Sequence, residues 1–355
     1  MDSFSYKDFA SRLLDWFDHH GRHDLPWQGR DDPYRTWVSE IMLQQTQVTT
    51  VIPYFQRFMD RFPRAEDLAS ADIDEVLSHW SGLGYYARGR NLHKAAQEIV
   101  SSHGGVFPQD LDALTALPGI GRSTAAAILA QAHDLPHAIL DGNVKRVLAR
   151  VHRVDGWPGQ TQVLKRLWAL SEAHTPEVRC ADYTQAIMDL GASICARTPQ
   201  CDQCPVSDFC QGHKQGDASH FPGRKPKRQK PEREAIMLLM VDKAQRVYLE
   251  KRPPSGLWGG LWTLPQFDGQ EQLLDWCDAA SVAGETIRPL GAPLTHAFTH
   301  FSLHITPVLL EASPGPDGVR DRDDAHWLSG EDWPGGIAKP TQLLIERFRS
   351  ARGPA

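Results

Sequence analysis

Four cysteines fall within sixteen residues of this chain, and no other stretch restricts its chemistry as tightly. The cluster consists of Cys195, Cys201, Cys204 and Cys210. Four thiolates packed this closely predict a single metal or iron–sulfur site. A disulfide pair is the alternative, but nothing else in the sequence indicates an oxidising compartment. The two remaining cysteines, Cys180 and Cys277, are expected to be buried thiols.

The length, the composition and the amino-terminal segment favour a soluble protein of two domains. Residues 1–17 contain no apolar core of signal-peptide type, and no run approaches the length of a membrane span. We therefore expect a cytoplasmic protein without a membrane partner. Of the 355 residues 41% are hydrophobic, so two halves can each bury a core. The net charge of −6 argues against a uniformly basic nucleic-acid binder but not against a local basic face.

A basic, proline-rich stretch divides the chain into two regions. Residues 216–233 contain six Lys or Arg and three Pro, so we expect an exposed linker over residues 216–232. Residues 1–215 are predicted to be all-α, because apolar residues recur there at multiples of three to four positions. The expected helices span residues 35–49, 66–80, 86–102, 122–133, 142–153, 160–173 and 181–194.

The pattern changes after the linker, and residues 233–350 are predicted to form an α+β domain. Short apolar runs separated by turns rich in Gly and Pro are typical of strands. Such runs occupy residues 235–242, 246–252 and 301–312, and the helical pattern returns at residues 273–280 and 340–350.

Two glycines mark a tight turn between predicted helices, in the segment LPGIGRSTAAAIL (117–129). Gly119 and Gly121 let the backbone turn sharply and bring its N–H groups close to an anion, while the following helix adds its dipole. A DNA phosphate is a natural ligand for such a turn. An ordinary corner between two helices is an equally good interpretation.

Two acidic residues could work as a pair. Asp141 precedes a periodic helix and is first of all a typical N-cap, whose amide donors would favour the ionised carboxylate. Glu40 lies among apolar neighbours in the expected helix 35–49, so desolvation would raise its pKa and keep it protonated. An acid and a fixed anion form the pair that a glycosidase needs. The sequence does not fix the distance between them.

Basic and aromatic residues suggest contact with nucleic acid. In GLGYYARGRNLHKAA (82–96), Tyr85 stands on a glycine-rich turn beside basic residues, as suits insertion into a base stack, although core packing is an equal alternative. The helix after Asp141 is expected to have a basic face, formed by Lys145, Arg146, Arg150 and Arg153.

These motifs occur in an order that closely resembles the MutY family of adenine DNA glycosylases, of the helix-hairpin-helix superfamily that includes endonuclease III. The resemblance rests on WVSEIMLQQTQV, GLGYYARGRNL, LPGIGRSTAAAIL, ILDGNVKRVL and QAIMDLGASIC, followed by the cysteines. It implies a multi-domain protein, with an all-α helix-hairpin-helix catalytic domain whose loop 195–210 binds one [4Fe-4S] cluster. A Nudix-like α+β domain is expected to follow.

The same resemblance implies roles for particular residues. Glu40 matches the general acid and Asp141 the aspartate that stabilises the transition state, with Asn143 close to it. Trp27, Gln28 and Gln185 fall where the family contacts the flipped adenine. The residues that match contacts to the opposing lesion or the duplex are Gln44, Tyr85, Phe298, Thr299 and His300.

The chain departs from the family pattern in three places. The gap between Cys195 and Cys201 holds five residues where the family has six, which puts the cluster geometry in question. Thr299 stands where the lesion loop usually has Ser. No Nudix catalytic box occurs in residues 233–355, so this domain is expected to recognise the lesion without hydrolysing nucleotides.

The hypothesis that explains most features is a monofunctional glycosylase that removes adenine paired with 8-oxoguanine or guanine in double-stranded DNA. A bacterial, nucleoid-associated monomer is expected. One alternative is an endonuclease III-like glycosylase and lyase, but its nucleophilic lysine is replaced here by Ser123. The other is a non-catalytic DNA-binding module with Zn²⁺ at the four cysteines, which leaves the acidic pair unexplained.

Overall fold

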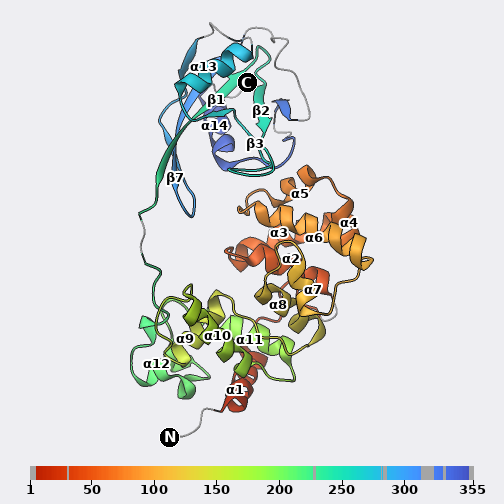
Figure 1. The fold of residues 1–355 in the computed structure, drawn as a ribbon, viewed down its shortest axis with the longest axis vertical. Coiled ribbons are helices and arrows are strands. Elements are labelled where there is room, and N and C mark those ends of the chain that lie inside the picture. The colour runs from red at the N-terminus through yellow and green to blue at the C-terminus, as the bar shows by residue number, and fades with distance from the viewer. Residues whose placement is uncertain are drawn as a thin grey trace. The chain divides into compact units, whose positions relative to one another are not determined.

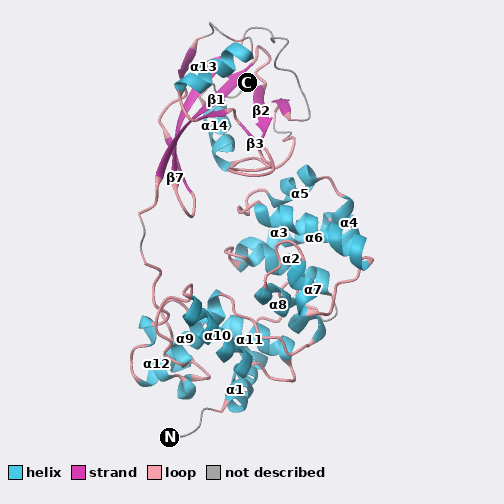
Figure 2. Cartoon of the chain, in the orientation of Figure 1, coloured by secondary structure: helices cyan, strands magenta, loops and turns pink. Residues whose placement is uncertain are grey.

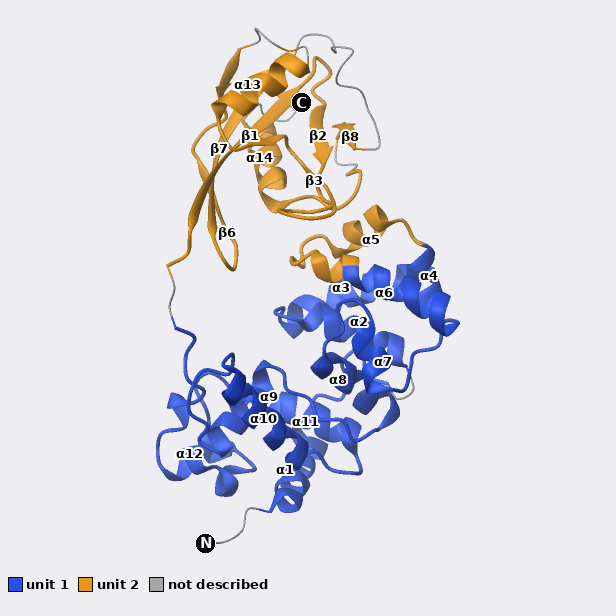
Figure 3. Ribbon diagram, in the orientation of Figure 1, with its two compact units in different colours: residues 1–70, 91–227 blue, residues 71–90, 228–355 orange. Residues whose placement is uncertain are grey.

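The chain forms two compact units in a computed structural model (Figures 1 and 3). The structure describes residues 5–29, 32–226, 229–280, 282, 286–312, 324–330 and 333–351. Unit 1 comprises residues 1–70 and 91–227, and unit 2 comprises residues 71–90 and 228–355. Two residues of the expected linker, Lys227 and Arg228, lie outside the described residues. The segment 71–90, which we expected within the helical domain, belongs by its contacts to the same unit as residues 228–355.

Unit 1 is helical throughout its described part, as the sequence predicts (Figure 2). Its helices are α1 (Tyr6–His20), α2 (Pro33–Leu43), α3 (Val48–Arg61), α4 (Ala65–Ser70), α6 (Ala87–His103, which begins in unit 2), α7 (Leu111–Ala116), α8 (Arg122–His133), α9 (Gly142–Val151), α10 (Thr161–His174), α11 (Cys180–Ala192) and α12 (Gln211–Lys214). None of the described helices combines the length and the apolarity that crossing a bilayer requires.

Side-chain caps define where several of these helices begin. Ser5, Asp32, Asp110 and Asp141 each accept a hydrogen bond from a backbone N–H in the first turn of the following helix.

Two expected helices are interrupted in the structure. The expected helix 35–49 ends at Leu43, and the chain reverses at Gln45, whose φ of 59° is left-handed, before α3 begins. The expected helix 66–80 is divided at Asp72, which caps a new helix.

The core of unit 1 explains why α8 and α9 sit at its centre. Helix α8 is buried from Ala125 to Ala130 and packs against α2 and α11. Helix α9 buries Val147 and Leu148 in a cluster with α1, α10 and α11. Because both helices are held by several neighbours, the residues at their amino-terminal ends have fixed positions.

The described residues of unit 2 form an eight-stranded sheet with a helix on each face. The order is β3-β2-β1-β7-β5, and the central pair β1 and β7 is parallel. The strands are β1 (Glu232–Val241), β2 (Val247–Lys251), β3 (Trp262–Thr263), β4 (Gln266–Phe267), β5 (Ile287–Pro289), β6 (Leu294–Ala297), β7 (Ser302–Glu311) and β8 (Ala325–Leu328). The helices of unit 2 are α5 (Ile73–Trp80), α13 (Gln270–Ala279) and α14 (Lys339–Ser350).

Alternation along β1 places the two carboxy-terminal helices on opposite faces. Met237 and Leu239 pack with α14, whereas Leu238 and Met240 pack with α13. The three strands and two helices that the sequence predicts are present as β1, β2, β7, α13 and α14, which confirms the α+β class.

Candidate active site and metal centre

One cavity of unit 1, of about 870 Å³, collects seven of the predicted site residues. Its lining includes Trp27, Glu40, Gln44, Ser123, Asp141, Asn143 and Gln185. They come from the segment before α2, from α2 itself and from the starts of α8 and α9, with Gln185 on α11. The structure therefore brings together the two carboxyl residues expected to act as acid and anion and two of the three expected adenine contacts.

Glu40 is a partly buried acid on α2 whose protonation is poised near neutrality. Its Oε1 accepts a hydrogen bond of 3.1 Å from Gln131 Nε2. Burial raises the pKa of Glu40 to about 7, the Gln131 bond opposes this, and the negative charge of Asp141 adds to it. A carboxyl with such a pKa can hold a proton at neutral pH and give it up, as a general acid must.

Asp141 caps α9 and points its carboxylate into the same cavity. Its oxygens accept hydrogen bonds from Val144 N at 2.7 Å and from Asn143 Nδ2 at 3.1 Å. The sequence led us to expect that amide donors would favour the ionised form. Burial nevertheless raises the pKa of Asp141, and its hydrogen bonds and the charge of Arg146 only oppose that rise.

Arg146 braces this carboxylate through Asn143. Its Nη2 donates to Asn143 Oδ1 at 2.8 Å and to the Gly191 carbonyl at 2.5 Å, and its Nε donates to the Cys195 carbonyl at 2.8 Å. The close approach of α9 and α11 requires glycine at 191, because a Cβ there would lie 2.6 Å from Asn143 Cβ. The sequence placed Arg146 only on a basic face and gave no signal of this role.

A buried carboxylate, Asp189, which pairs with the half-buried Arg22, orients Gln185. Asp189, 3% exposed, accepts hydrogen bonds from Arg22 N, Nε and Nη2 at 2.8, 2.9 and 2.5 Å. It also accepts one from Gln185 Nε2 at 2.7 Å. A carboxylate only accepts, so the Gln185 amide must turn its nitrogen toward Asp189 and its oxygen away. Sequence analysis missed Arg22 and Asp189, since charged residues in and beside helices are usually solvated.

The third expected adenine contact, Gln28, has a different environment. Its Oε1 accepts from Leu25 N at 2.9 Å and its Nε2 donates to the Arg22 carbonyl at 2.6 Å. It lines a neighbouring cavity of about 290 Å³ together with Trp27 and Gln185. Both ends of the amide are thus engaged in holding the loop that carries Trp27.

The glycine turn lies at the start of α8. Gly119 has a φ of 79°, and a Cβ there would come within 2.8 Å of Asn91 Cβ. Gly121 is the N-cap and has no side chain to satisfy the first amides of the helix, which leaves them for an anion or water. Ser123 Oγ accepts a 2.9 Å hydrogen bond from Leu140 N, so it ties this turn to the residue before Asp141.

Of the residues expected to meet the opposing lesion or the duplex, Gln44 lines the cavity of unit 1, and the other four lie in unit 2. Tyr85 is 47% exposed and has a left-handed φ of 48°. Phe298 begins the turn between β6 and β7, where it stacks on Phe301 with 4.5 Å between ring centroids. Thr299 and His300 are exposed at the tip of this turn.

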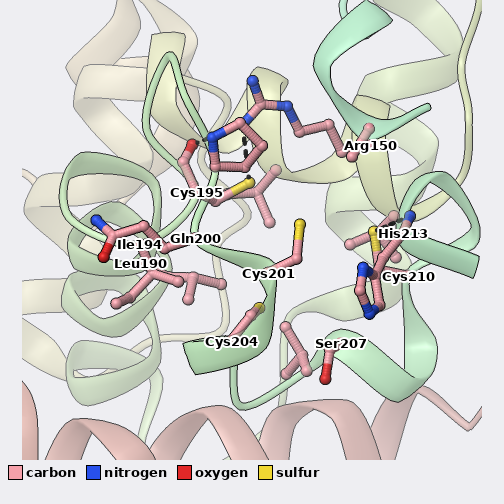
Figure 4. Close-up of a pocket in the computed structure, with 15 residues that line it drawn as sticks. Arg150, Leu190, Ile194, Cys195, Gln200, Cys201, Cys204, Ser207, Cys210 and His213 are labelled. Carbon is pink, nitrogen blue, oxygen red and sulfur yellow. Dashed lines mark hydrogen bonds between the residues drawn. The ribbon is translucent and has the colours of Figure 1, made fainter. Parts of the chain in front are cut away.

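The four clustered cysteines surround one cavity between α9, α11 and the loop that follows (Figure 4). All are free thiols, and so are Cys180 and Cys277, which rules out the disulfide alternative in this structure. Two sulfurs accept N–H bonds, Cys195 Sγ from Arg150 Nη1 at 3.3 Å and Cys210 Sγ from His213 N at 3.4 Å. Hydrogen bonds to sulfur are typical around iron–sulfur clusters.

The four sulfurs line one shared hollow. Cysteine thiolates are the usual ligands of iron–sulfur clusters, so this donor set suits such a cluster. These four residues would hold the group.

Arg150 supports the shortened cysteine loop from within. It is only 2% exposed, so it does not belong to the basic face that we expected on α9. Besides the Cys195 sulfur, its guanidinium donates to the carbonyls of Cys195, Ala196, Arg197 and Phe221, at 2.7 to 3.2 Å. A buried arginine with these partners can fix the path of the loop despite the missing residue.

Comparisons with known proteins agree with this architecture. The helix-hairpin-helix superfamily of base excision DNA repair proteins matches residues 38–173, and the NUDIX domain matches residues 236–347. The iron–sulfur binding domain of endonuclease III matches residues 196–210, a range that begins just after Cys195. Fold and site thus define a helix-hairpin-helix repair protein with an iron–sulfur motif and a Nudix-like domain.

Similar whole chains narrow this class to one family. An adenine DNA glycosylase of Buchnera aphidicola (subsp. Baizongia pistaciae) is 38% identical over 84% of this chain and 85% of its own. The human adenine DNA glycosylase is 34% identical over 92% of this chain and 71% of its own. The structure of a thermostable thymine-DNA glycosylase, 30% identical, has a TM-score of 0.54 and covers 59% of this chain and 97% of its own. The chain belongs to the adenine DNA glycosylase family, whose members are hydrolases of N-glycosyl bonds.

Proposed function

We propose that this enzyme removes adenine mispaired with 8-oxoguanine or guanine in double-stranded DNA, by hydrolysis and without strand cleavage. The observation that carries the proposal is that Glu40, with a pKa raised to about 7, lines one cavity with Asp141 and Gln185. An acid that is protonated near neutrality and a second carboxylate in the same cavity suit cleavage of a glycosidic bond.

In this mechanism the adenine is flipped from the duplex into the cavity, at a cost of a few kcal/mol. Glu40 donates a proton to N7, which makes the base a better leaving group. The C1′–N9 bond breaks with an oxocarbenium-like sugar, and the Asp141 carboxylate, held by Val144 N and Asn143, stabilises that positive charge. Water then completes the hydrolysis.

Recognition of adenine would depend on the fixed orientation of the Gln185 side-chain amide. Because its nitrogen donates to Asp189, its oxygen is the free acceptor on the cavity side. Adenine carries a donor amino group at C6, whereas hypoxanthine carries an acceptor there. Trp27, which is buried beside this amide, would offer its ring as one wall for the base.

The monofunctional assignment rests on Ser123. A lyase needs an amine nucleophile at this position, and the Ser123 hydroxyl is already engaged with Leu140 N. The hairpin glycines, Gly119 and Gly121, would hold a DNA phosphate. Gln44, at the rim of the cavity, and Tyr85 would contact the duplex, and the turn with Phe298, Thr299 and His300 would contact the 8-oxoguanine.

One [4Fe-4S] cluster would be bound by Cys195, Cys201, Cys204 and Cys210. When bound it would organise the loop around residues 196–210, because nothing in the hydrolysis requires an electron. This chain's own contribution is Arg150, which holds the loop carbonyls and the Cys195 sulfur. We further propose that the enzyme works as a monomer on the bacterial chromosome in the cytoplasm, which the bacterial relatives support.

A single-turnover assay on a duplex with one 8-oxoguanine:adenine pair tests the proposal. Adenine release should leave an abasic site, so the strand should break only when alkali is added. Strand cleavage without alkali would revive the lyase alternative, and a failure to release adenine would refute the substrate. A guanine:adenine duplex run in parallel measures the preference between the two mispairs.

A further inference from the structure

The turn that carries Tyr85 is held by the carboxy-terminal unit. It follows α5, and both lie within the segment 71–90 that is part of unit 2 (Figure 3). This segment is far from the sheet in sequence, so its membership in unit 2 needs a set of contacts specific to it.

Apolar packing provides the first set. Leu77 of α5 is fully buried in a cluster with Leu261 and Ala338, two residues of the carboxy-terminal domain. Tyr86 and Trp258 pack against the same cluster. The backbone at Gly336 approaches so closely that a Cβ there would lie 3.0 Å from Leu77 Cβ, so a larger residue would be crowded at this point.

Three polar contacts surround this cluster. Lys251 Nζ of β2 lies 2.6 Å from Asp74 Oδ2 of α5. Tyr86 Oη donates to the Ile337 carbonyl at 3.1 Å, and Arg90 Nη1 donates to the Gly259 carbonyl at 2.5 Å. Asp74 precedes Tyr85 in the chain, whereas Tyr86 and Arg90 follow it. The turn is thus anchored to the domain on both sides.

The turn itself is tightly constrained. Gly82, Gly84 and Tyr85 all have positive φ, and such a conformation at a tyrosine persists only where the surroundings enforce it. Trp80 Nε1 donates to the Gly84 carbonyl at 3.1 Å, and Arg88 Nη2 donates to the same carbonyl at 3.2 Å. The Arg88 guanidinium also lies over the Tyr85 ring, 5.4 Å from its centroid. The exposed ring is therefore presented by a rigid turn.

We propose that the carboxy-terminal domain is a clamp that positions Tyr85 for entry into the duplex, in addition to reading the lesion. Asp74, Lys251 and Tyr86 are its positioning residues. The domain then carries both the Tyr85 turn and the turn at Phe298 as parts of one body, so probing of the duplex and reading of the lesion are coupled. This inference rests on the proposed function, because it assumes that Tyr85 meets DNA.

The clamp is tested first without DNA, on the full chain. Hydrogen exchange of residues 81–88 should be faster in Lys251→Met and in Tyr86→Phe than in wild type. The double charge swap Asp74→Lys with Lys251→Asp should restore slow exchange. Arg288→Met, which removes an exposed ion pair with Glu311 elsewhere in unit 2, is the control and should leave the exchange of residues 81–88 unchanged. Unchanged exchange in both test variants would overturn the clamp, whatever the enzyme's substrate.

Rates of adenine release then distinguish a displaced Tyr85 from a general loss of structure. Single-turnover adenine release is measured on two duplexes. The first has 8-oxoguanine opposite adenine. The second has an abasic site opposite adenine, so no base has to be displaced there. Tyr86→Phe and Lys251→Met should slow the first by about tenfold to 10²-fold, the effect of a misplaced group, and leave the second near wild type. Equal losses on both duplexes, or no loss on either, would overturn the inference. Absence of adenine release by wild type would instead refute the proposed function.

Discussion

At both carboxyl groups of the cavity, burial raises the pKa more than hydrogen bonds lower it. Glu40 has one amide donor against its desolvation, so it keeps a proton near neutral pH. Asp141 has two donors and faces Arg146, which favour its charged form against the same desolvation. Sequence alone could nominate both residues, because one stands among apolar neighbours and the other at a helix start. It could not foresee the direction of the Asp141 shift, which depends on how deeply the fold buries it.

The sequence did not predict which charged residues hold other functional residues in place. Arg22, Asp189 and Arg150 look like ordinary surface charges, since nothing in their local pattern indicates a partner far away in sequence. Asp189 meets Arg22 across 167 positions, and Arg150 meets Cys195 across 45. Only the packing of α11 against α1 and α9 creates these partnerships.

Asp189→Asn should weaken the distinction between adenine and purine, which lacks the amino group. An asparagine can accept or donate, so the Gln185 amide would no longer be held in one sense. We expect the ratio of excision rates, adenine over purine opposite 8-oxoguanine, to fall by about threefold to tenfold, the worth of one hydrogen bond. Asp208→Asn, at an exposed ion pair with Arg12, is the control. A wild-type ratio in Asp189→Asn would disprove orientation by Asp189.

Element boundaries were less accessible to sequence than element types. The apolar residues on either side of the polar stretch 44–47, Ile41 and Val48, keep a helical spacing, so the break between α2 and α3 is invisible to this pattern. That break brings Gln44 to the cavity. The strands β1 and β7 were recognisable from composition. Their parallel pairing was not, because the partners are joined through about sixty intervening residues.

A histidine pair joins the ends of α9 and α10 and should make the fold sensitive to acid. The Nε2 atoms of His152 and His174 are 2.7 Å apart, so one must donate and the other, which must be neutral, accepts. Burial lowers the pKa of His152 to about 4 and that of His174 to about 3. The unfolded chain therefore binds protons first. Stability from this pair is complete above pH ~6.5 and is lost as the pH falls toward 4, by up to about 1.4 kcal/mol per pH unit for each proton.

Urea unfolding at pH 7.5, 6.5 and 5.5 measures this loss. His152→Gln keeps an amide donor for His174 but removes one titrating group. Its free energy of unfolding should therefore fall less steeply with decreasing pH than that of wild type. His19→Gln, at an exposed site on α1, should keep the wild-type slope. If His152→Gln showed that slope too, the pair would not be the acid-sensitive element.

The loop 195–210 should contain about four irons per chain when the protein is purified without air. The expectation follows from four free sulfurs around a shared hollow. Cys201→Ser should lower iron content and DNA affinity more than the rate of the chemical step, because the loop would lose its organising group. Cys277→Ser, in unit 2, is the matched control. Near-zero iron with one zinc per chain would refute the cluster and leave the glycosylase assignment intact.

At the scale of the whole molecule, composition and the linker indicated two regions with different secondary structure. The assignment of residues 71–90 to unit 2 could not be predicted, because α5 resembles any short amphipathic helix and its partners, Leu261 and Ala338, are distant in sequence. This segment also means that cutting the chain at the linker would expose Leu77. Substitutions in the full chain are therefore cleaner tests of lesion reading than truncation.

His300→Ala, at the exposed turn between β6 and β7, should reduce the preference for 8-oxoguanine over guanine. The expected loss is about 1–3 kcal/mol in discrimination, the usual worth of a specific base contact. Adenine release from both mispairs should be compared at one salt concentration, since phosphate contacts make affinity salt-dependent. Glu271→Ala, exposed on α13, is the control. An unchanged ratio would mean that this turn does not read the lesion.

The rate of adenine release by Glu40→Gln, against that of wild type across pH, tests the central claim most directly. The substitution keeps the size of the side chain and removes its proton, so binding to the mispaired duplex should persist while release falls by at least about 10²–10⁴-fold. Because the pKa of Glu40 is raised to about 7, the wild-type single-turnover rate should be highest below that pH and should decline as the pH rises above it. Near wild-type release by Glu40→Gln would contradict the account.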